Sequence, residues 1–492
     1  MVMQRTIHPL DGSYTILGER RPAQFGQTLE VRSPVDGSVI GAVHEYTHEE
    51  VDAILARCAV EQPAWGELPL DERAGILHRF ADELDLQADN LAELLVMEIA
   101  KGRRDARDEI VRSADLVRFT AVEAERVAGD AQFSDSLQRQ DRGRLAISYR
   151  VPLGTVLAIP PFNYPVNLAV SKVAPALVAG NAVVLKPPSQ GSLTATVIGE
   201  LLARAGAPVG VFNVVTGRGS VIGDHLVQHP RVSMIAFTGS SETGRELARK
   251  AGMVPLTLEL GGKDAAIVLG DADLDAAAAD IVGGAFTYSG QRCTAVKRVL
   301  CVESVADELV GRLADRIARL SVGDPRRDCV ITPLVDPTSA DRAVAMIDQA
   351  LRMGAVMLCG GGRQDNLLEP VLLDQVNENM DIAWVEPFAP VLPVIRVPHA
   401  AAAVELSNRG EYGLQAAVFS RDVDVATQVA LQLDVGTVRI NGRAARGPEH
   451  SPFVGTRSSG MGTRGVRHSI EAMTRLKSVV LNIRPQDLGE VR

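Results

Sequence analysis

Between residues 146 and 300, short apolar runs alternate with longer amphipathic stretches, and this alternation constrains the fold more than any other feature of the chain. The apolar run "GTVLAIP" is followed by "NLAVSKVAPALVAG", and "AVVLKPP" is followed by "SLTATVIGELLARAG". We predict strands for the short runs and helices that end at glycine for the longer stretches. Strands that alternate with helices of this length predict parallel βαβ units.

A second series of the same kind follows residue 300. It includes "RVLCVES", "VADELVGRLADRIARL", "AVMLCGG" and "VLPVIRV". Two doubly wound, Rossmann-like α/β domains are the simplest interpretation of the two series. The segments "RLAISYRVP" and "SVVLNIRP" are predicted to form strands outside both sheets.

The charge and the distribution of apolar residues argue against several classes of protein. The formal net charge is −10, which disfavours broad binding to nucleic acid or to an anionic membrane. The sequence has no uninterrupted run of about 18 apolar residues, so no membrane span is expected. The first residues show no signal-peptide pattern, and a cytoplasmic location is predicted.

The cysteines and histidines bear on redox compartment and on metal binding. None of the five cysteines belongs to a C-x-x-C pair, and their odd number fits a reducing compartment better than a disulfide framework. The nine histidines show no H-E-x-x-H or comparable spacing. We therefore predict no metal site.

One cysteine, Cys293, lies in the stretch "YSGQRCTAVKR", which contains Gly290 and places Arg292 directly before the thiol. Two interpretations are open on these residues alone. Cys293 is either a small buried hydrophobic side chain, as many free cysteines are, or a nucleophile whose thiolate is favoured by nearby positive charge.

Two further stretches bear on a nucleotide site. In "FTGSSETGRE", Gly239 and Gly244 would let backbone amides approach a phosphate at a helix N-terminus, although a plain strand–helix turn fits equally well. In "VLKPPSQG", Lys186 is followed by neutral residues where a carboxylate commonly binds the ribose hydroxyl groups. A cation with neutral donors tolerates a 2′-phosphate and favours NADP, with NAD as the second candidate. The alternative is an ordinary polar loop.

Four motifs occur together in the chain, namely "PPFNYPVN", "LELGGKD", "YSGQRCTA" and "VEPFAP". In this order and spacing they resemble the aldehyde dehydrogenase superfamily, from about residue 28 to 480. The sequences of these motifs are most similar to those of the non-phosphorylating, NADP-dependent glyceraldehyde-3-phosphate dehydrogenases. The resemblance implies oxidation of a short phosphorylated aldehyde, with glyceraldehyde 3-phosphate as the expected substrate and 3-phosphoglycerate as the expected product.

The resemblance also implies three catalytic residues. Cys293 attacks the aldehyde carbon to give a thiohemiacetal, while the Asn163 amide and the Cys293 backbone N–H hold the oxyanion. Hydride transfer then leaves a thioester. Water activated by Glu259 hydrolyses this thioester.

By the same resemblance, six residues are expected at the cofactor and four around the substrate phosphate. The cofactor residues are Lys186, Ser189, Gly239, Ser240, Glu386 and Phe388. The substrate residues are Arg126, Tyr164, Arg292 and Arg446. Several guanidinium groups around a dianion make charge-assisted contacts that also select for geometry.

The chain departs from the family pattern at a few positions. Val385 and Ala389 stand in "VEPFAP", and Arg443 and Ser451 lie near the expected substrate loop. These departures keep a second substrate class open, a phosphonoaldehyde or another small anionic aldehyde that undergoes the same chemistry in a specialised pathway.

The family fold implies a division of the chain into three parts. Residues 1–138 and 153–259, with 461–474, are expected to bind the cofactor, and residues 260–460 to form the catalytic domain. Residues 139–152 and 475–492 are expected to be oligomerisation strands. A homotetramer or homodimer is predicted, because an exposed strand edge needs cover.

Overall fold

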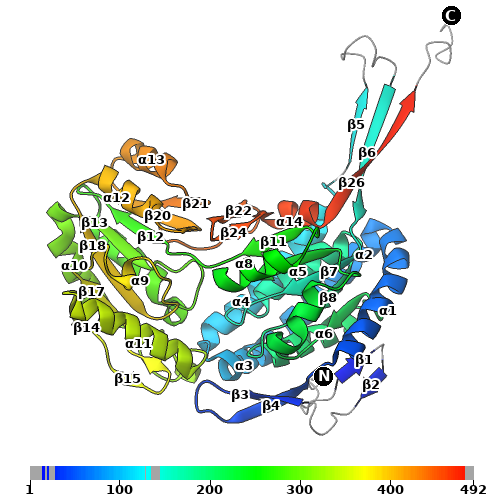
Figure 1. Cartoon of the computed structure of the whole chain (residues 1–492), viewed down its shortest axis with the longest axis horizontal. Helices are drawn as coiled ribbons and strands as arrows, with labels where there is room; N and C mark the ends of the chain where they lie inside the picture. The colour runs from blue at the N-terminus through cyan, green and yellow to red at the C-terminus, as the bar shows by residue number, and fades with distance from the viewer. Residues whose placement is uncertain (1–13, 17–18, 22–27, 128, 134–143, 483–492) are drawn as a thin grey trace, which may run out of the picture.

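The computed structural model describes residues 14–16, 19–21, 28–127, 129–133 and 144–482. These residues form two α/β lobes and a narrow three-stranded arm that extends beyond both (Figure 1). In the described part of the chain, no helix is both long and apolar enough to cross a membrane.

The first lobe is built on a six-stranded sheet, in which only β24 is antiparallel to its neighbour. In sheet order the strands are β24 (Gly460–Met461), β11 (Leu256–Glu259), β10 (Met234–Thr238), β7 (Thr155–Ile159), β8 (Ala182–Leu185) and β9 (Phe212–Val214). The chain runs outward from β7 through β8 and β9, and then returns to the other side of β7 for β10 and β11. The strand order therefore reverses between β7 and β10.

Helices cover both faces of this sheet because each strand is apolar on both sides. Along β7, Val156 and Ala158 join one core cluster and Leu157 joins the other. The helices on the first face are α2 (Leu70–Leu86), α3 (Ala88–Ile99), α4 (Arg103–Ala124), α5 (Asn167–Val178) and α6 (Ser192–Arg204). The second face is covered by α1 (His48–Glu67) and α8 (Ser241–Lys250).

The second lobe has a seven-stranded sheet that is parallel except for its edge strand β14. In sheet order the strands are β14 (Val356–Cys359), β17 (Val371–Asp374), β18 (Val391–Val397), β13 (Arg298–Val302), β12 (Ala265–Val268), β20 (Gln415–Phe419) and β21 (Thr437–Ile440). The covering helices are α9 (Leu274–Phe286) and α10 (Glu303–Ile317) on one face, and α11 (Pro337–Arg352), α12 (Ala400–Asn408) and α13 (Val423–Gln432) on the other.

The arm is an antiparallel sheet of β26 (Thr474–Asn482), β6 (Arg144–Pro152) and β5 (Asp130–Phe133). Figure 1 shows it projecting away from the first lobe. It carries exposed apolar side chains, including Val479, Val480 and Leu481. β6 and β26 lie in the two segments for which strands outside the main sheets were predicted.

The α/β fold with two doubly wound sheets is thus confirmed. Its consequence for function follows from the topology of the first sheet. Open parallel sheets bind ligands beyond the carboxyl ends of their strands, at the point where the strand order reverses. Here that point lies beyond the ends of β7 and β10, and the segments that follow them carry the predicted site residues.

Candidate active site

A cavity of about 1110 Å³ lies at the carboxyl ends of the first sheet and extends to the second lobe. The segments after β7, β8, β10 and β11 contribute Asn163, Lys186, Gly239 and Gly261 to its lining. Cys293, from the loop before β13, borders the same cavity. The volume suits a ligand as large as a dinucleotide, because pockets for drug-sized molecules span about 300–1,000 Å³.

The loop that presents Cys293 is held in a strained backbone conformation. Tyr288 and Ser289 both have positive φ, 53° and 54°, which non-glycine residues rarely adopt. The Ser289 hydroxyl donates to the Thr332 carbonyl at 2.8 Å and accepts the Thr332 N–H at the same distance. At Gly290, a Cβ atom would lie 2.4 Å from the Ala389 carbonyl oxygen, so the close approach of these two segments requires glycine.

Asn163 is tied to the same loop. Its buried side-chain Nδ2 donates to the Gln291 carbonyl at 2.7 Å, and its backbone carbonyl accepts a hydrogen bond from Lys101 Nζ at 2.8 Å. A side-chain amide has two N–H donors, so one remains for a ligand. The structure therefore brings Asn163 and Cys293 together at one cavity wall, as the motifs predicted.

Tyr164 and Tyr288 are joined through a buried ion pair. Lys101 and Glu109 form this pair, and Lys101 Nζ lies 3.5 Å from the centre of the Tyr164 ring. The Tyr164 and Tyr288 rings meet edge to face, with centres 6.3 Å apart. Sequence patterns gave no sign of Lys101, which connects the Asn163 segment to the cysteine loop.

The environment of Cys293 differs from the expectation that Arg292 favours its thiolate. Burial raises the pKa of the Cys293 thiol to about 11, even though Lys297 acts in the opposite direction. Arg292 donates through Nη2 to the Gly284 carbonyl instead. A thiol taken out of water favours its neutral form, and this effect exceeds the attraction of the nearby cation. Of the two interpretations left open by the sequence, the raised pKa does not favour activation of the thiol by Arg292 in the free protein.

We expect alkylation of Cys293 by iodoacetamide to accelerate with pH in the free protein. Because the thiolate is the reactive species, the rate should rise about tenfold per pH unit between pH 7 and 10. The Cys293→Ser variant supplies the background from the other cysteines. A rate that levels off below pH 8 would show that the thiol is already activated without ligands.

Glu259 ends β11, where it lies opposite Thr238 of β10 in the parallel register. The Thr238 hydroxyl donates to Glu259 Oε2 at 2.8 Å and accepts from Lys172 Nζ at 2.6 Å. Glu259 is buried and does not border the large cavity, whereas Thr238 does. Its charge nevertheless acts on Cys293, because it contributes to the raised pKa of that thiol.

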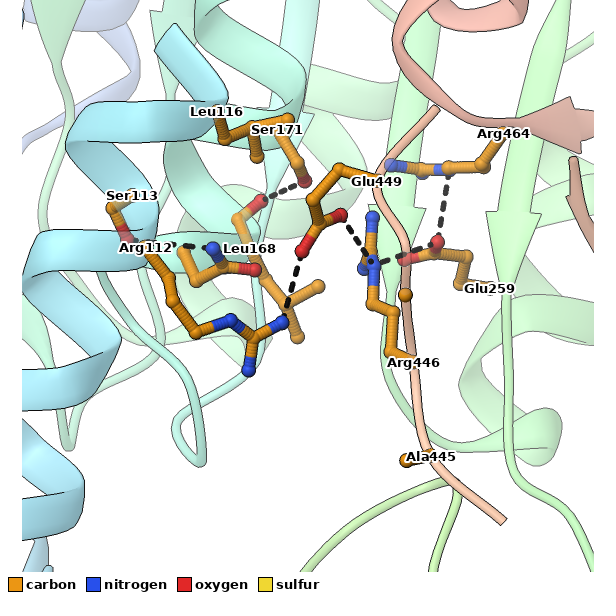
Figure 2. Close-up of polar contacts among 12 residues, drawn as sticks. Arg112, Ser113, Leu116, Leu168, Ser171, Glu259, Ala445, Arg446, Glu449 and Arg464 are labelled. Carbon is orange, nitrogen blue, oxygen red and sulfur yellow. Dashed lines mark hydrogen bonds and ion pairs between the residues drawn. The ribbon is translucent and has the colours of Figure 1, made fainter. Parts of the chain in front are cut away.

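Two guanidinium groups face the other oxygen of Glu259. Oε1 lies 3.5 Å from Arg446 Nη1 and 3.4 Å from Arg464 Nε, as Figure 2 shows. Burial by itself raises the pKa of Glu259, but Arg464, Arg446 and Lys172 outweigh it and lower this pKa to about 2. The carboxylate is therefore ionised throughout the physiological range.

A chain of alternating charges continues from Arg446 to α4. Glu449 Oε2 lies 3.5 Å from Arg446 Nε, and Glu449 Oε1 lies 2.9 Å from Arg112 Nη2 (Figure 2). Arg446 and Glu449 also line a smaller cavity of about 180 Å³. Arg112 was not among the predicted site residues, because no motif surrounds it.

Arg126, by contrast, does not join this group. Its side chain is 71% exposed and its ion-pair partner is Glu123, one turn earlier. Arg126 lies 14 residues beyond Arg112, just past the end of α4, which corresponds to about 20 Å along a helix axis. The structure thus places Arg112, and not Arg126, beside Arg446.

Five of the six predicted cofactor residues line the large cavity. They are Lys186, Gly239, Ser240, Glu386 and Phe388. Ser189 is exposed and is not among the lining residues. The Ser240 side chain caps α8 by accepting the Thr243 N–H at 3.2 Å. The "FTGSSETGRE" stretch therefore opens a helix whose first turn lines the cavity.

Glu386 is held near the cysteine loop. Its Oε1 lies 3.0 Å from Lys297 Nζ, and Lys297 Nζ also donates to the Cys293 carbonyl. At Gly261 a Cβ atom would lie 2.2 Å from Glu386 Oε2, so a larger residue there would displace this carboxylate. Lys297 thus links Glu386 to the nucleophile's backbone.

Among the described residues, Asp52, His225 and His229 form a cluster with the spacing of metal ligands. Asp52 Oδ1 lies 2.6 Å from His225 Nε2 and 3.3 Å from His229 Nε2. The backbone N–H of Arg231 donates to His229 Nδ1 at 3.1 Å. The neutral His229 ring therefore carries its proton on Nε2 and donates it to Asp52, which disfavours metal ligation through that nitrogen.

A sequence profile described as the aldehyde dehydrogenase family matches residues 21–479. The chain belongs to this family. The NADP-dependent glyceraldehyde-3-phosphate dehydrogenase of Streptococcus equinus is 48% identical to it over 457 residues, 93% of this chain and 96% of that protein. The protein of the same name from Triticum aestivum is 47% identical over 479 residues, 96% of each chain.

Solved structures of the aldehyde dehydrogenase family share the whole fold. The NADP-dependent glyceraldehyde-3-phosphate dehydrogenase from Bacillus halodurans, crystallised with NADP, is 47% identical and has a TM-score of 0.95, covering 96% of this chain and 100% of that one. An aldehyde dehydrogenase from Brucella melitensis has a TM-score of 0.93 at 30% identity, covering 98% and 100%. The predicted family and its aldehyde-oxidising class of enzyme are thus confirmed.

Proposed function

We propose that this aldehyde dehydrogenase oxidises glyceraldehyde 3-phosphate to 3-phosphoglycerate with NADP⁺. The arrangement of Arg112, Glu449 and Arg446 carries the proposal. In it the Glu449 carboxylate lies between two guanidinium groups, so anionic oxygens are accommodated there. The names of the Streptococcus equinus and Triticum aestivum relatives support the same substrate and cofactor.

Lys186 and the neutral residues that follow it make the cavity suitable for NADP. Lys186 Nζ borders the cavity, and its hydrogen bond among the described residues is to the Pro187 carbonyl at 2.8 Å. No acidic side chain follows it before Gly191, so an added phosphate meets no like charge in this segment. When bound, the nicotinamide cofactor accepts a hydride from the substrate.

Cys293 is the proposed nucleophile. Once deprotonated, its sulfur attacks the aldehyde carbon, and the carbonyl electrons move onto oxygen to give a thiohemiacetal. The Asn163 amide and the Cys293 backbone N–H donate to that oxyanion. Loss of hydride from the same carbon leaves a thioester on Cys293.

Glu259 is the proposed general base for the second half of the reaction. It accepts a proton from the water that attacks the thioester carbon, and the acid leaves as the Cys293 thiol is restored. In this structure Glu259 is bound by Arg446 and Arg464 outside the cavity. Its carboxylate therefore has to turn towards Cys293 before it can act.

The product identifies the reaction. The protein should convert glyceraldehyde 3-phosphate and NADP⁺ to equal amounts of NADPH and 3-phosphoglycerate in a buffer free of inorganic phosphate. Mass spectrometry should find the free acid and no acyl phosphate. A requirement for inorganic phosphate, or an acyl phosphate product, would refute the proposed hydrolysis.

Arg112 provides a test of the anion site. We expect Arg112→Ala to raise KM for glyceraldehyde 3-phosphate about tenfold to a hundredfold, because a hydrogen bond to a charged group contributes about 1.5–3 kcal/mol. KM for unphosphorylated glyceraldehyde should change less than about twofold. The matched control is Arg126→Ala, on the exposed end of the same segment, which should leave both constants unchanged. Equal losses for both aldehydes would remove Arg112 from the anion site.

Lys186 provides a test of cofactor recognition. Burial lowers the pKa of its ammonium group to about 8, so it is protonated below that pH and neutral above it. We expect kcat/KM for NADP⁺ to fall as the pH rises through 8, while kcat/KM for NAD⁺ stays level over the same range. Lys186→Met should remove the difference between the two profiles. Parallel profiles in the unaltered protein would contradict this assignment.

We also propose that the arm mediates assembly. β6 and β26 expose apolar side chains, and β26 is an edge strand of the described arm, so a second copy of the chain would cover both. The proposed assembly is a homodimer or homotetramer, and the proposed domain boundaries follow the sheets. The five cysteines are all free, which supports a reducing compartment such as the cytoplasm.

A further inference from the structure

Arg464 is the largest fully buried side chain of the described chain, and it has unusually few partners. It lies on β25 (Thr463–Arg464), which follows β24, the strand that pairs with β11 and with Glu259 at its end. None of its three guanidinium nitrogens has a hydrogen-bond partner among the described residues. Its ion pair is with Glu259 Oε1, 3.4 Å from Nε.

A buried charge without hydrogen bonds is costly, so its retention calls for a functional explanation. A glutamine or methionine at this position would fill much of the same space without the charge. What the guanidinium adds is a fixed positive charge beside the carboxylate that we propose as the general base. Figure 2 shows Arg464 above the Glu259 carboxylate and Arg446 to its left.

The two arginines around Glu259 differ in their other contacts. Arg446 is 18% exposed, lines the smaller cavity and also contacts Glu449. Arg464 is 2% exposed, and Glu259 is its counter-ion. Arg446 therefore has alternative anionic partners within reach, whereas Arg464 has none on the described chain besides Glu259.

We propose that Arg464 is a positioning residue that keeps a positive charge beside Glu259 while Arg446 binds the anionic end of the substrate. The inference rests on the proposed function, because it takes Glu259 as the base and Arg446 as part of the anion site. The inference adds that the two guanidinium groups have different roles: Arg464 pairs with Glu259, and Arg446 binds the substrate.

The other groups that face Glu259 do not supply the positive charge that Arg464 supplies. Lys172 Nζ is 4.0 Å from Glu259 Oε2, and burial, with the nearby Arg464, lowers the pKa of Lys172 well below its ordinary value. The Thr238 hydroxyl supplies a hydrogen bond but no charge. Burial is the largest influence on the pKa of Glu259 and raises it, so the loss of both arginines would raise this pKa.

The test compares the pH dependence of kcat for two aldehydes in the Arg464→Gln variant. With glyceraldehyde 3-phosphate, the substrate phosphate occupies Arg446, so kcat should fall about tenfold or more between pH 8 and pH 5.5. With unphosphorylated glyceraldehyde, Arg446 stays with Glu259, so kcat should stay within about twofold over this range.

Two further variants serve as controls. Arg464→Lys, which keeps a charge, should restore a level profile with both aldehydes. The exposed neighbour Arg467 supplies the control variant, Arg467→Gln, with no change expected.

Arg446→Gln provides a second, independent measurement should Arg464→Gln fail to fold. With Arg446 removed, Arg464 alone should keep kcat for unphosphorylated glyceraldehyde level from pH 8 to pH 5.5. A fall in that profile would overturn the proposal, as would an Arg464→Gln profile that superposes on that of the unaltered protein. If Glu259→Gln still hydrolyses the thioester at the full rate, the assignment of the base itself fails, which separates that failure from a failure of the role of Arg464.

Discussion

Replacing Cys293 with serine should reduce aldehyde-dependent NADPH formation by roughly 10⁴-fold or more, because a hydroxyl at this position has no base that turns it into a nucleophile. Asn163 is an amide that donates to the Gln291 carbonyl, and Lys297 already donates to the Cys293 carbonyl, so neither is available as a base. Steady-state rates with saturating aldehyde and NADP⁺ provide the measurement. Cofactor binding, followed by protein fluorescence, should remain, since the sulfur is a small part of the cavity wall.

Cys329→Ser is the matched control for this variant. Cys329 is also free and partly buried, but it does not line the cavity. Its substitution should leave kcat within about twofold, because changes away from such sites have small effects. Undiminished turnover in the Cys293→Ser variant would eliminate the covalent mechanism, whatever the control shows.

Replacing Glu259 with glutamine should separate the two halves of the reaction. Thioester formation does not use the base, so the variant should release a burst of about one NADPH per active site. Steady-state turnover should then be about 10²- to 10⁴-fold slower, the usual contribution of a general base. Stopped-flow absorbance at the NADPH wavelength resolves both phases.

Glu303→Gln is a suitable control, because Glu303 is largely exposed and pairs with Arg396 far along the second lobe. It should show the kinetics of the unaltered protein. The burst in Glu259→Gln also reports that the variant is folded and binds both ligands. A variant that loses the burst together with turnover would place Glu259 before the hydride step and contradict its proposed role.

The sequence predicted the fold and the cavity wall well where short motifs and strand ends coincide. The βαβ pattern placed strands at "GTVLAIP", "AVVLKPP" and "MIAFTGS", and their carboxyl ends carry the residues that line the cavity. Parallel strands that share one sheet bring their ends together, so adjacency in space follows from the pattern. Asn163 and Gly239 lie close together for this reason, whereas Cys293 reaches the same cavity from the loop before β13 of the second lobe.

The ion pairs around the site were harder to predict from the sequence, because they join segments that are far apart in the chain. Arg112 and Arg126 both belong to a helical stretch, and nothing in their neighbours tells which of them meets Glu449, more than 300 residues later. Arg464 stands in no motif, and its role emerges only from burial beside Glu259. The sequence left the effect of Arg292 on Cys293 open, because adjacency in sequence does not determine where a guanidinium group points; in the structure Arg292 donates to the Gly284 carbonyl.

The central claim is that a phosphorylated aldehyde is oxidised directly to its acid with NADP⁺. Initial rates of NADPH formation, without added inorganic phosphate, should be compared for glyceraldehyde 3-phosphate, phosphonoacetaldehyde and unphosphorylated glyceraldehyde. We predict that glyceraldehyde 3-phosphate has the highest kcat/KM, at least about tenfold above each of the others, the contribution of one charge-assisted contact. A higher kcat/KM for unphosphorylated glyceraldehyde or for the phosphonate would contradict the proposed substrate while leaving the family and its covalent chemistry intact.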